Sequence, residues 1–268
     1  MNEYMWGPEK KRAALSVTFD NLGEAADMAL GRCPPGHSLG RHFTATHVVP
    51  ELLKELRGVN ITYFVEAVNA RLYPEVLKAI RDAGHEVALH AWAHENWQGL
   101  NLQQQADNLQ MSLEALGKLS VEPRGFRPPG GAISPESLAL LQETGFTYCS
   151  PLSDMPTGRV ENEFVILPFI WRHVDAYLLE PKLSERRLSN GDPEAPLDPE
   201  GWAEILATAV DQAVATGQHL TIIFHPYVLG SDFRLVNILK EFLEKVCSRD
   251  DLWVAPAFEV ASWVSKTN

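Results

Sequence analysis

The sequence predicts an α/β protein, a distorted (β/α) barrel of seven or eight strands that forms a single domain over residues 1–268. Two observations predict this class. Short apolar, β-branched runs alternate with longer helical patterns along the whole chain, as in sheets built from βα units. In addition, 268 residues with 45% hydrophobic and 22% charged content are enough for one core of the size that a single barrel requires.

The predicted elements follow one another in this alternation. An amphipathic helix is predicted over 74–83, because Gly84 provides a stop signal directly behind its apolar face. Ser134 and Pro135 predict the N-cap and first turn of another helix, which ends near Gly145. The predicted strands are short apolar or β-branched runs, and they lie at 14–19, 61–65, 86–89, 124–126, 147–149, 164–167, 220–224 and 252–255.

Two long segments, 21–46 and 182–199, interrupt the alternation and are predicted as loops. In compact domains, loops of this length are usually functional rims or exposed excursions. The length of the first one raises the hypothesis that it caps the pocket of a neighbouring subunit in a homo-oligomer. Light scattering that shows a monomer would remove that hypothesis.

The charge balance excludes several classes of partner. The chain has 23 Lys and Arg against 35 Asp and Glu, and the resulting formal charge of −12 repels phosphate backbones and anionic lipid surfaces. We therefore expect neither nucleic acid nor membrane partners. Residues 1–12 lack the apolar segment of a secretory signal, and the three cysteines form no CxxC pair, so we expect a reducing, cytoplasmic setting.

Ionisable residues stand just past the ends of five predicted strands. They are Asp20, Glu66, His90, Arg127 and His225. In a (β/α) barrel the carboxyl ends of the strands converge on one rim, where active sites are built. We therefore expect these side chains to lie around one pocket, although Glu66 is interpreted as a hydrogen-bonding residue of the rim and not as a catalyst.

His90 and His94 place two imidazoles four residues apart, so both can reach one divalent ion with a carboxylate as third ligand. This spacing alone is a weak signal in a chain with nine histidines. The position at a strand end, with Asp20 on the same predicted rim, strengthens it.

The stiff turn that begins at Arg127 is suited to holding a guanidinium against a carboxylate, and the alternative is a turn with a surface arginine. His225 follows the apolar run 220–224, so we expect a partly buried imidazole that titrates near neutral pH. A structural histidine satisfied by one hydrogen bond is the alternative here.

Taken together and in order, these motifs resemble those of the polysaccharide deacetylases, carbohydrate esterase family four. They are Thr18-Phe19-Asp20, His90-xxx-His94, Arg127-Pro128-Pro129-Gly130 and Phe224-His225. The stretch from Leu167 to Trp171, with Asp175, resembles the tryptophan and aspartate motif of the same family. The resemblance spans residues 16–227, which is most of the chain.

The resemblance implies a metal-assisted hydrolase of non-peptide amide bonds that deacetylates an N-acetylated sugar or related small amide. It implies that Asp20 is the general base, that His225 protonates the departing amine and that Arg127 orients Asp20. His90 and His94 would hold a divalent metal, zinc foremost, with Asp20 completing the site. The substrate, a small molecule or an oligosaccharide, would contact Pro129, Gly130, Trp171 and Asp175.

The chain departs from the family pattern at Asn21, where the family usually has the second of two adjacent aspartates. An amide oxygen can coordinate a cation, but it lacks the charge attraction of a carboxylate. Either Asp20 completes an Asp-His-His site, leaving the base role to His225 or Glu66, or the metal is weak or absent. Three alternatives stay open: a metal-independent amide, imide or ureide hydrolase, a non-catalytic carbohydrate-binding relative, and an unrelated barrel with structural histidines.

Overall fold

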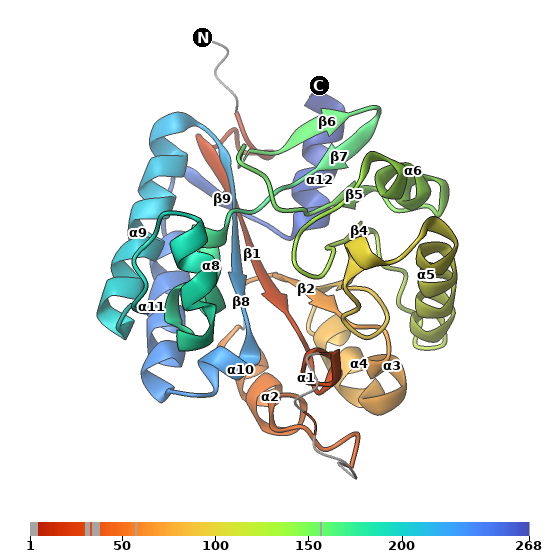
Figure 1. Cartoon of the computed structure of the whole chain (residues 1–268). Helices are drawn as coiled ribbons and strands as arrows, with labels where there is room; N and C mark the ends of the chain where they lie inside the picture. Colours follow the sequence, from red (N-terminus) through yellow and green to blue (C-terminus); the bar gives the residue numbers. More distant parts are fainter. Residues whose placement is uncertain (1–4, 30–32, 34–37, 57, 156, 268) are drawn as a thin grey trace.

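The computed structural model describes residues 5–29, 33, 38–56, 58–155 and 157–267. Within these residues a curved nine-stranded sheet has the order β6-β7-β5-β4-β3-β2-β1-β8, and β9 pairs with β1 (Figure 1). All neighbours are parallel except β6 and β7. The strands are β1 (Ala13–Asp20), β2 (Thr62–Val65), β3 (Glu86–Leu89), β4 (Gly125–Phe126), β5 (Tyr148–Cys149), β6 (Arg159–Glu161), β7 (Phe164–Ile166), β8 (His219–Phe224) and β9 (Leu252–Val254).

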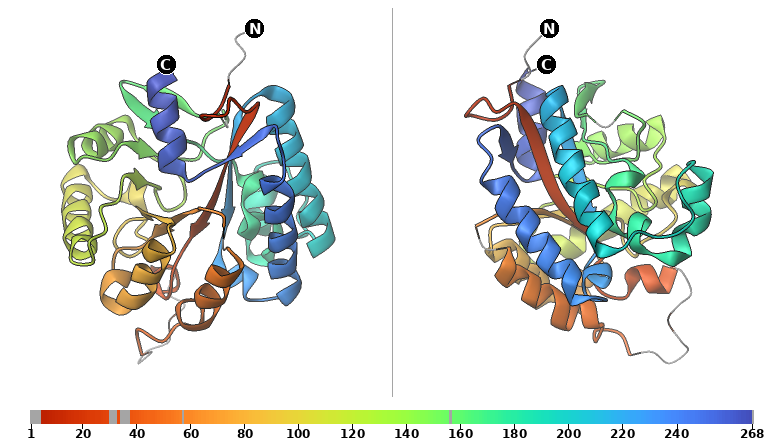
Figure 2. Two further views of the ribbon diagram at one scale, coloured as in Figure 1. Left: turned by 180° about the vertical axis from the view of Figure 1, so that it is seen from behind. Right: turned by 90° about the vertical axis from the view of Figure 1, so that its left-hand side faces the viewer.

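Helices surround this sheet on both sides (Figures 1 and 2). They are α1 (Ala25–Ala29), a π-helix (Thr44–Val48), α2 (Val49–Glu55), α3 (Asn69–Leu72), α4 (Pro74–Asp82), α5 (Leu102–Gly117), α6 (Pro135–Glu143), α7 (Asp175–Leu179), α8 (Ser184–Ser189), α9 (Pro199–Thr216), α10 (Pro226–Leu229), α11 (Phe233–Cys247) and α12 (Ala257–Thr267). Single 3₁₀ turns occupy Trp97–Gly99, Trp171–His173 and Pro181–Leu183.

Strand β1 lies next to the edge strand β8, and its eight residues are all buried because β2, β8 and β9 flank it and helices cover both faces. Strands buried in this way read as continuous apolar runs, which is why the sequence reveals them. Each of the eight predicted strands is confirmed, with its ends displaced by at most one residue. The predicted helix 74–83 is confirmed as α4, and Ser134 caps α6 by accepting from the backbone N–H of Ser137.

The strand count exceeds the predicted seven or eight because β6 was missed. It forms an antiparallel hairpin with β7 through the two-residue turn Asn162-Glu163, in which φ is 50° and 65°. Turns of this kind need left-handed backbone at both positions and are usually marked by Asn-Gly. Glutamate at the second position hides that signal. The hairpin forms one edge of the sheet and β8 the other, so the barrel stays open between them in the described residues.

The two predicted long loops are partly helical, so that prediction is wrong in part. Segment 21–46 contains α1 and the start of the π-helix, while 30–32 and 34–37 lie outside the described residues. Segment 182–199 contains α8 and reaches the first residue of α9.

Arg187 of α8 explains why the second segment is ordered. It is buried, and its guanidinium donates to the carbonyl oxygens of Tyr177 at 2.6 Å, Glu180 at 3.0 Å and Glu194 at 2.7 Å. These bonds join α7 to the chain on both sides of α8, and charge-assisted bonds of this kind are the stronger ones. None of the described helices has both the length and the apolarity that crossing a bilayer requires.

Candidate active site

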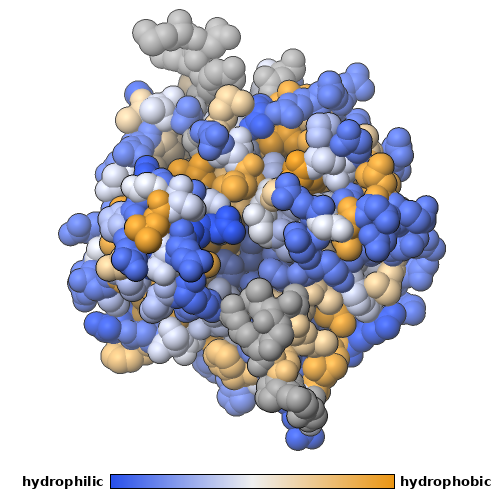
Figure 3. Space-filling view, in the orientation of Figure 1, coloured by the Kyte–Doolittle hydropathy of each residue, from blue (hydrophilic) through white to orange (hydrophobic). Residues whose placement is uncertain are grey.

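A cavity of about 240 Å³ opens at the carboxyl ends of the central strands. The residues that follow β1, β3, β4 and β8 line its floor, and the segments 21–44 and 169–186 supply walls. Figure 3 shows this hollow near the middle of the face, among mainly hydrophilic side chains. Parallel strands place their carboxyl ends at one rim, so residues distant in sequence meet there.

Asp20 and Arg127 form a buried ion pair at the floor of the pocket. Arg127 is 1% exposed, and its Nη1 donates to Oδ1 of Asp20 at 2.5 Å and to Oγ1 of Thr18 at 2.9 Å. Its Nη2 donates to Oγ of Ser150 at 2.9 Å, and its guanidinium carbon lies 3.9 Å from the ring centroid of Phe64. The alternative of a surface arginine is therefore wrong, and the ion pair with Arg127 fixes the orientation of the Asp20 carboxylate.

His90 has a defined tautomer. Its Nδ1 lies 2.7 Å from the carbonyl oxygen of Arg127, and because a carbonyl can only accept, Nδ1 carries the proton and Nε2 a lone pair. The ring centroid of His94 lies 5.1 Å from that of His90. Burial lowers the pKa of both, and the pKa of His94 falls to about 3. Both imidazoles are therefore neutral at pH 7, as a metal ligand must be.

Asn21 has a left-handed backbone with φ of 65°, a conformation that asparagine tolerates better than most residues. Its Oδ1 is buried and has no hydrogen-bond partner. An orphaned buried acceptor is costly, so an oxygen left in this state beside a pocket is suited to a ligand that the protein itself does not supply.

The pocket lining includes nitrogen and oxygen atoms of the kind that divalent ions accept as ligands. Among the described residues no three His, Cys, Asp or Glu side chains form a group that could hold a metal. Oδ1 of Asn21, which lies outside those residue types, can join Nε2 of His90 and the ring of His94 as a third donor on the same pocket. Such a set has nitrogen and oxygen ligands that divalent ions accept, but no negative charge.

His225 is held by Asp175. Nδ1 of His225 lies 2.6 Å from Oδ1 of Asp175, and its backbone N–H donates to Oδ2 at 2.7 Å. Burial by itself lowers the pKa of His225, but the charge and hydrogen bond of Asp175, together with Asp20, raise it more, so the pKa lies above its usual range. The imidazole makes one hydrogen bond within the described residues, to the carboxylate of Asp175, and it also lines the pocket, which a purely structural histidine does not require. The raised pKa favours the protonated form more than in a free imidazole, and Nε2 is left for the pocket.

The structure brings most predicted site residues together. Those that line the pocket are Asp20, His90, His94, Arg127, Gly130, Trp171 and His225. Pro129 is buried outside the lining, and Asp175 is fully buried and meets the pocket through His225, so neither is placed as a direct substrate contact. Glu66 directly follows β2 and makes hydrogen bonds, as expected, but it is fully buried and does not line the pocket.

Several lining residues were missed by sequence reasoning. They come from the two segments interpreted as loops and from the residues after β8, and they include Asp27, His42, Thr44, Lys182, Arg186 and Tyr227. The length of those segments was the only signal. No local pattern shows which of their side chains turn inward.

Glu66 is a buried carboxyl beneath the first loop. Its Oε2 accepts from the backbone N–H of Leu22 at 3.0 Å and from Nδ2 of Asn69 at 3.1 Å, while Oε1 has no partner. Burial raises the pKa of Glu66 to about 8. The protonated acid is therefore the form present in the folded protein at neutral pH.

This raised pKa predicts a pH dependence of stability. Between pH 4.5 and 8 the unfolded chain releases the proton of Glu66 and the folded chain keeps it, so stability falls as pH rises through that window. In the wild type this loss of unfolding free energy amounts to about 4 kcal/mol at most. Glu66→Gln mimics the protonated acid, so the variant should not show the loss. Urea unfolding at pH 5 and pH 8 measures it. Glu51→Gln, an exposed control, should keep the wild-type slope, and equal slopes in all three proteins would contradict the assignment.

Comparison with known proteins matches residues 8–149 to the family model described as polysaccharide deacetylase. Peptidoglycan deacetylase-like protein FGM2 of Gibberella zeae is 34% identical over 158 residues, which are 54% of this chain and 46% of that protein. The matched stretch thus spans about half the length of this curated relative.

Solved structures extend the likeness over nearly all of the chain. A candidate polysaccharide deacetylase of Mycobacterium smegmatis has a TM-score of 0.83 at 28% identity and covers 97% of this chain and 93% of its own. Puue allantoinase has a TM-score of 0.80 at 18% identity, covering 100% and 95%, and this second likeness concerns the fold alone.

Proposed function

Because this chain belongs to the polysaccharide deacetylase family, we propose that it hydrolyses a non-peptide amide bond and removes an acetyl group from an amino sugar or related small amide. One observation carries the proposal: two separately held acid–base groups, Asp20 on Arg127 and His225 on Asp175, line one pocket. A carboxylate can accept a proton and an imidazole can donate one, so two such groups on one pocket can serve as the base and the acid of a hydrolysis.

The proposed reaction uses these groups in turn. Asp20 takes a proton from the attacking water, whose oxygen bonds to the acyl carbon. Arg127 keeps the carboxylate pointed at that water, because four of its contacts fix the guanidinium. His225 then gives its Nε2 proton to the amine nitrogen as the carbon–nitrogen bond breaks. Acetate and the free amine leave, and the proton that Asp20 took returns to His225 through solvent water.

We propose that His90, His94 and Asn21 hold a divalent ion, zinc foremost. When bound, such an ion supplies Lewis-acid polarisation of the acyl carbonyl. Asp20 is proposed as base and not as third ligand, because its Oδ1 accepts from Arg127 whereas Oδ1 of Asn21 has no partner.

The test is acetate release from N-acetylglucosamine and its short oligomers, measured with the purified protein, after chelation, and after zinc is restored. We expect release that chelation abolishes and zinc recovers. The neutral donor set makes the ion easy to remove, so brief dialysis should suffice. No release from any of these compounds with zinc, cobalt or manganese would overturn the proposal.

The neutral Asn21 favours a second candidate, a hydrolase of imides or ureides that works without a metal. It predicts ring opening of a cyclic ureide at a rate that chelation leaves unchanged. Acetate release that depends on zinc would eliminate it.

A further inference from the structure

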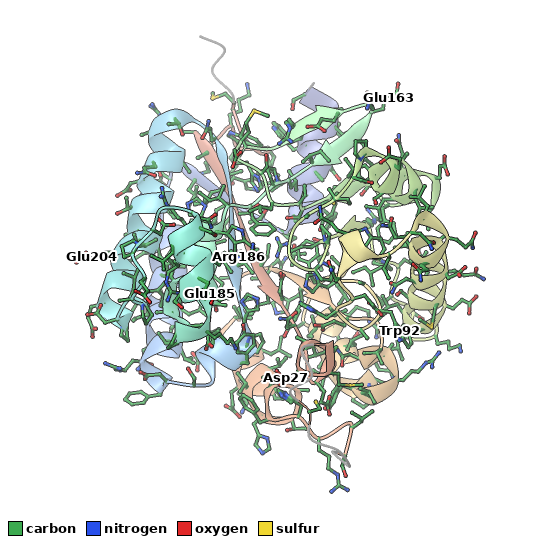
Figure 4. The ribbon with its side chains drawn as sticks, in the orientation of Figure 1. Asp27, Trp92, Glu163, Glu185, Arg186 and Glu204 are labelled. Carbon is green, nitrogen blue, oxygen red and sulfur yellow. The ribbon has the colours of Figure 1, made fainter. Side chains whose placement is uncertain are left out.

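One wall of the pocket is formed by the segment from the 3₁₀ turn Trp171–His173 to α8. Arg186 of α8 has its guanidinium carbon 5.0 Å from the ring centroid of Trp171, and both residues line the pocket. Figure 4 shows Arg186 on α8 beside the hollow of Figure 3. Trp171 is itself fixed, because its ring packs edge-on against Phe169 at 5.9 Å and tilted against Tyr177 at 5.7 Å.

Arg186 differs from the other cations of its segment. Arg172 forms an ion pair with Asp192 at 2.7 Å, and Lys182 forms one with Glu180 at 3.0 Å. The N–H groups of Arg187 donate to backbone carbonyl oxygens. In the part of the chain that the structure describes, the guanidinium of Arg186 makes no ion pair and no hydrogen bond with the protein, and its contact is the face of Trp171. An exposed cation held on an aromatic face keeps all its N–H groups for another molecule.

A second cation lies on the same wall. Lys182 also lines the pocket, and its Nζ is 5.0 Å from the ring centroid of Tyr227. Arg127, which also lines the pocket, is neutralised by Asp20, and Lys182 is paired with Glu180. Among the Lys and Arg side chains of the described lining, Arg186 is therefore the one without an ion-pair partner, and Lys182 is a second, paired cation on the same wall.

The negative net charge of the chain is the reason why an unpaired cation in the pocket matters for anion binding. At −12 the protein as a whole repels anions, so an anionic compound enters only where local cations outweigh that field. The guanidinium of Arg186 lies over the indole of Trp171, and the described residues accept no hydrogen bond from it. Its N–H groups can therefore bind a carboxylate or phosphate with two parallel hydrogen bonds.

We propose that Arg186, assisted by Lys182, binds an anionic group of the substrate, a carboxylate or a phosphate, while the acyl amide lies at Asp20 and His225. This inference rests on the proposed function and narrows its substrate class to acidic N-acyl compounds. Trp171 then positions the guanidinium of Arg186. The hydrogen bonds of Arg187 hold the segment that carries both residues in place.

The test compares N-acetylglucosamine with its 6-phosphate and with N-acetylmuramic acid, which carries a carboxylate. We expect one of the two acidic compounds to be the better substrate, and its identity tells which anion the site takes. Arg186→Gln should raise KM for that compound about 10- to 100-fold with kcat within about twofold, and should change KM for the neutral sugar much less. Lys118→Gln, which removes one exposed charge outside the pocket, is the control and should change neither value.

Equal effects of Arg186→Gln on the neutral and acidic compounds, or no preference of the wild type for either acid, would overturn the inference. If the wild type hydrolyses none of the three, the proposed function is decided by the oligomers named above, and calorimetric titration with the same three compounds tests the anion site separately. Binding of an acidic compound that weakens with added salt and with Arg186→Gln supports the site. Equal affinity of both proteins refutes it.

Discussion

Asp175→Asn lowers kcat about 10²- to 10⁴-fold in the proposed reaction and leaves the fold intact. Asparagine has nearly the same shape, and its oxygen can still accept from the backbone N–H of His225. Its amide group, however, carries no charge and cannot hold the protonated imidazole as a carboxylate does. The variant thus loses the acid, His225, that protonates the substrate amide, and keeps the base, Asp20.

The pH profile distinguishes this explanation from simple damage. His225 must be protonated to act, so activity is lost as pH rises through its pKa, which Asp175 raises in the wild type. Asp175→Asn should move that basic limb to lower pH. His225→Ala combined with Asp175→Asn should be no worse than His225→Ala alone, since the two residues act as one unit. An unshifted basic limb with a large loss of kcat would contradict the role assigned to Asp175.

Asn21→Asp strengthens zinc binding about 100-fold, the second large effect that we expect. The carboxylate adds a negative charge to an otherwise neutral donor set of two imidazoles and an amide. Aspartate also adopts the left-handed backbone of Asn21 more readily than most residues do, so the exchange adds little strain. Calorimetric titration of chelator-treated protein with zinc measures the change directly and without any assay of activity.

Two further variants make the result specific. Asn21→Ala should weaken zinc binding below that of the wild type, because it removes the oxygen, and His94→Ala should remove most of the remaining affinity. Zinc affinity that is the same with asparagine, aspartate and alanine at this position would show that the third donor lies elsewhere. Asp20 would then be the candidate, as the sequence expects.

The strands and the location of the site could be predicted because both depend on local signals. A strand buried on both faces is a continuous apolar run, and a functional residue directly after such a run lies at the shared rim. This is how Asp20, His90 and His225 were found. Their convergence needed no knowledge of which strands pair.

The pairing of Arg127 with Asp20 was expected from the resemblance, although the two residues are 107 positions apart. The partner of His225 was not predicted, because it lies 50 residues away on another segment and no local pattern joins the two. Asp175 was expected to contact the substrate. A motif indicates that an aspartate is functional, but it does not show which residue the aspartate contacts. The order of α8 was missed for the same reason: Arg187 stabilises it through carbonyl oxygens, which every residue has and no sequence pattern marks.

The pairing of β1 with β8 also sets when the site can exist during synthesis. Thr18 donates from its Oγ1 to the carbonyl oxygen of Ile222, 204 residues later. A ribosome must therefore release about four fifths of the chain before β1 can pair with β8, and until then that side of β1 is an unpaired edge. Strand β2, which is synthesised early, pairs with the opposite side of β1 and leaves this edge open, so Asp20 and His225 meet only in the last stage of folding.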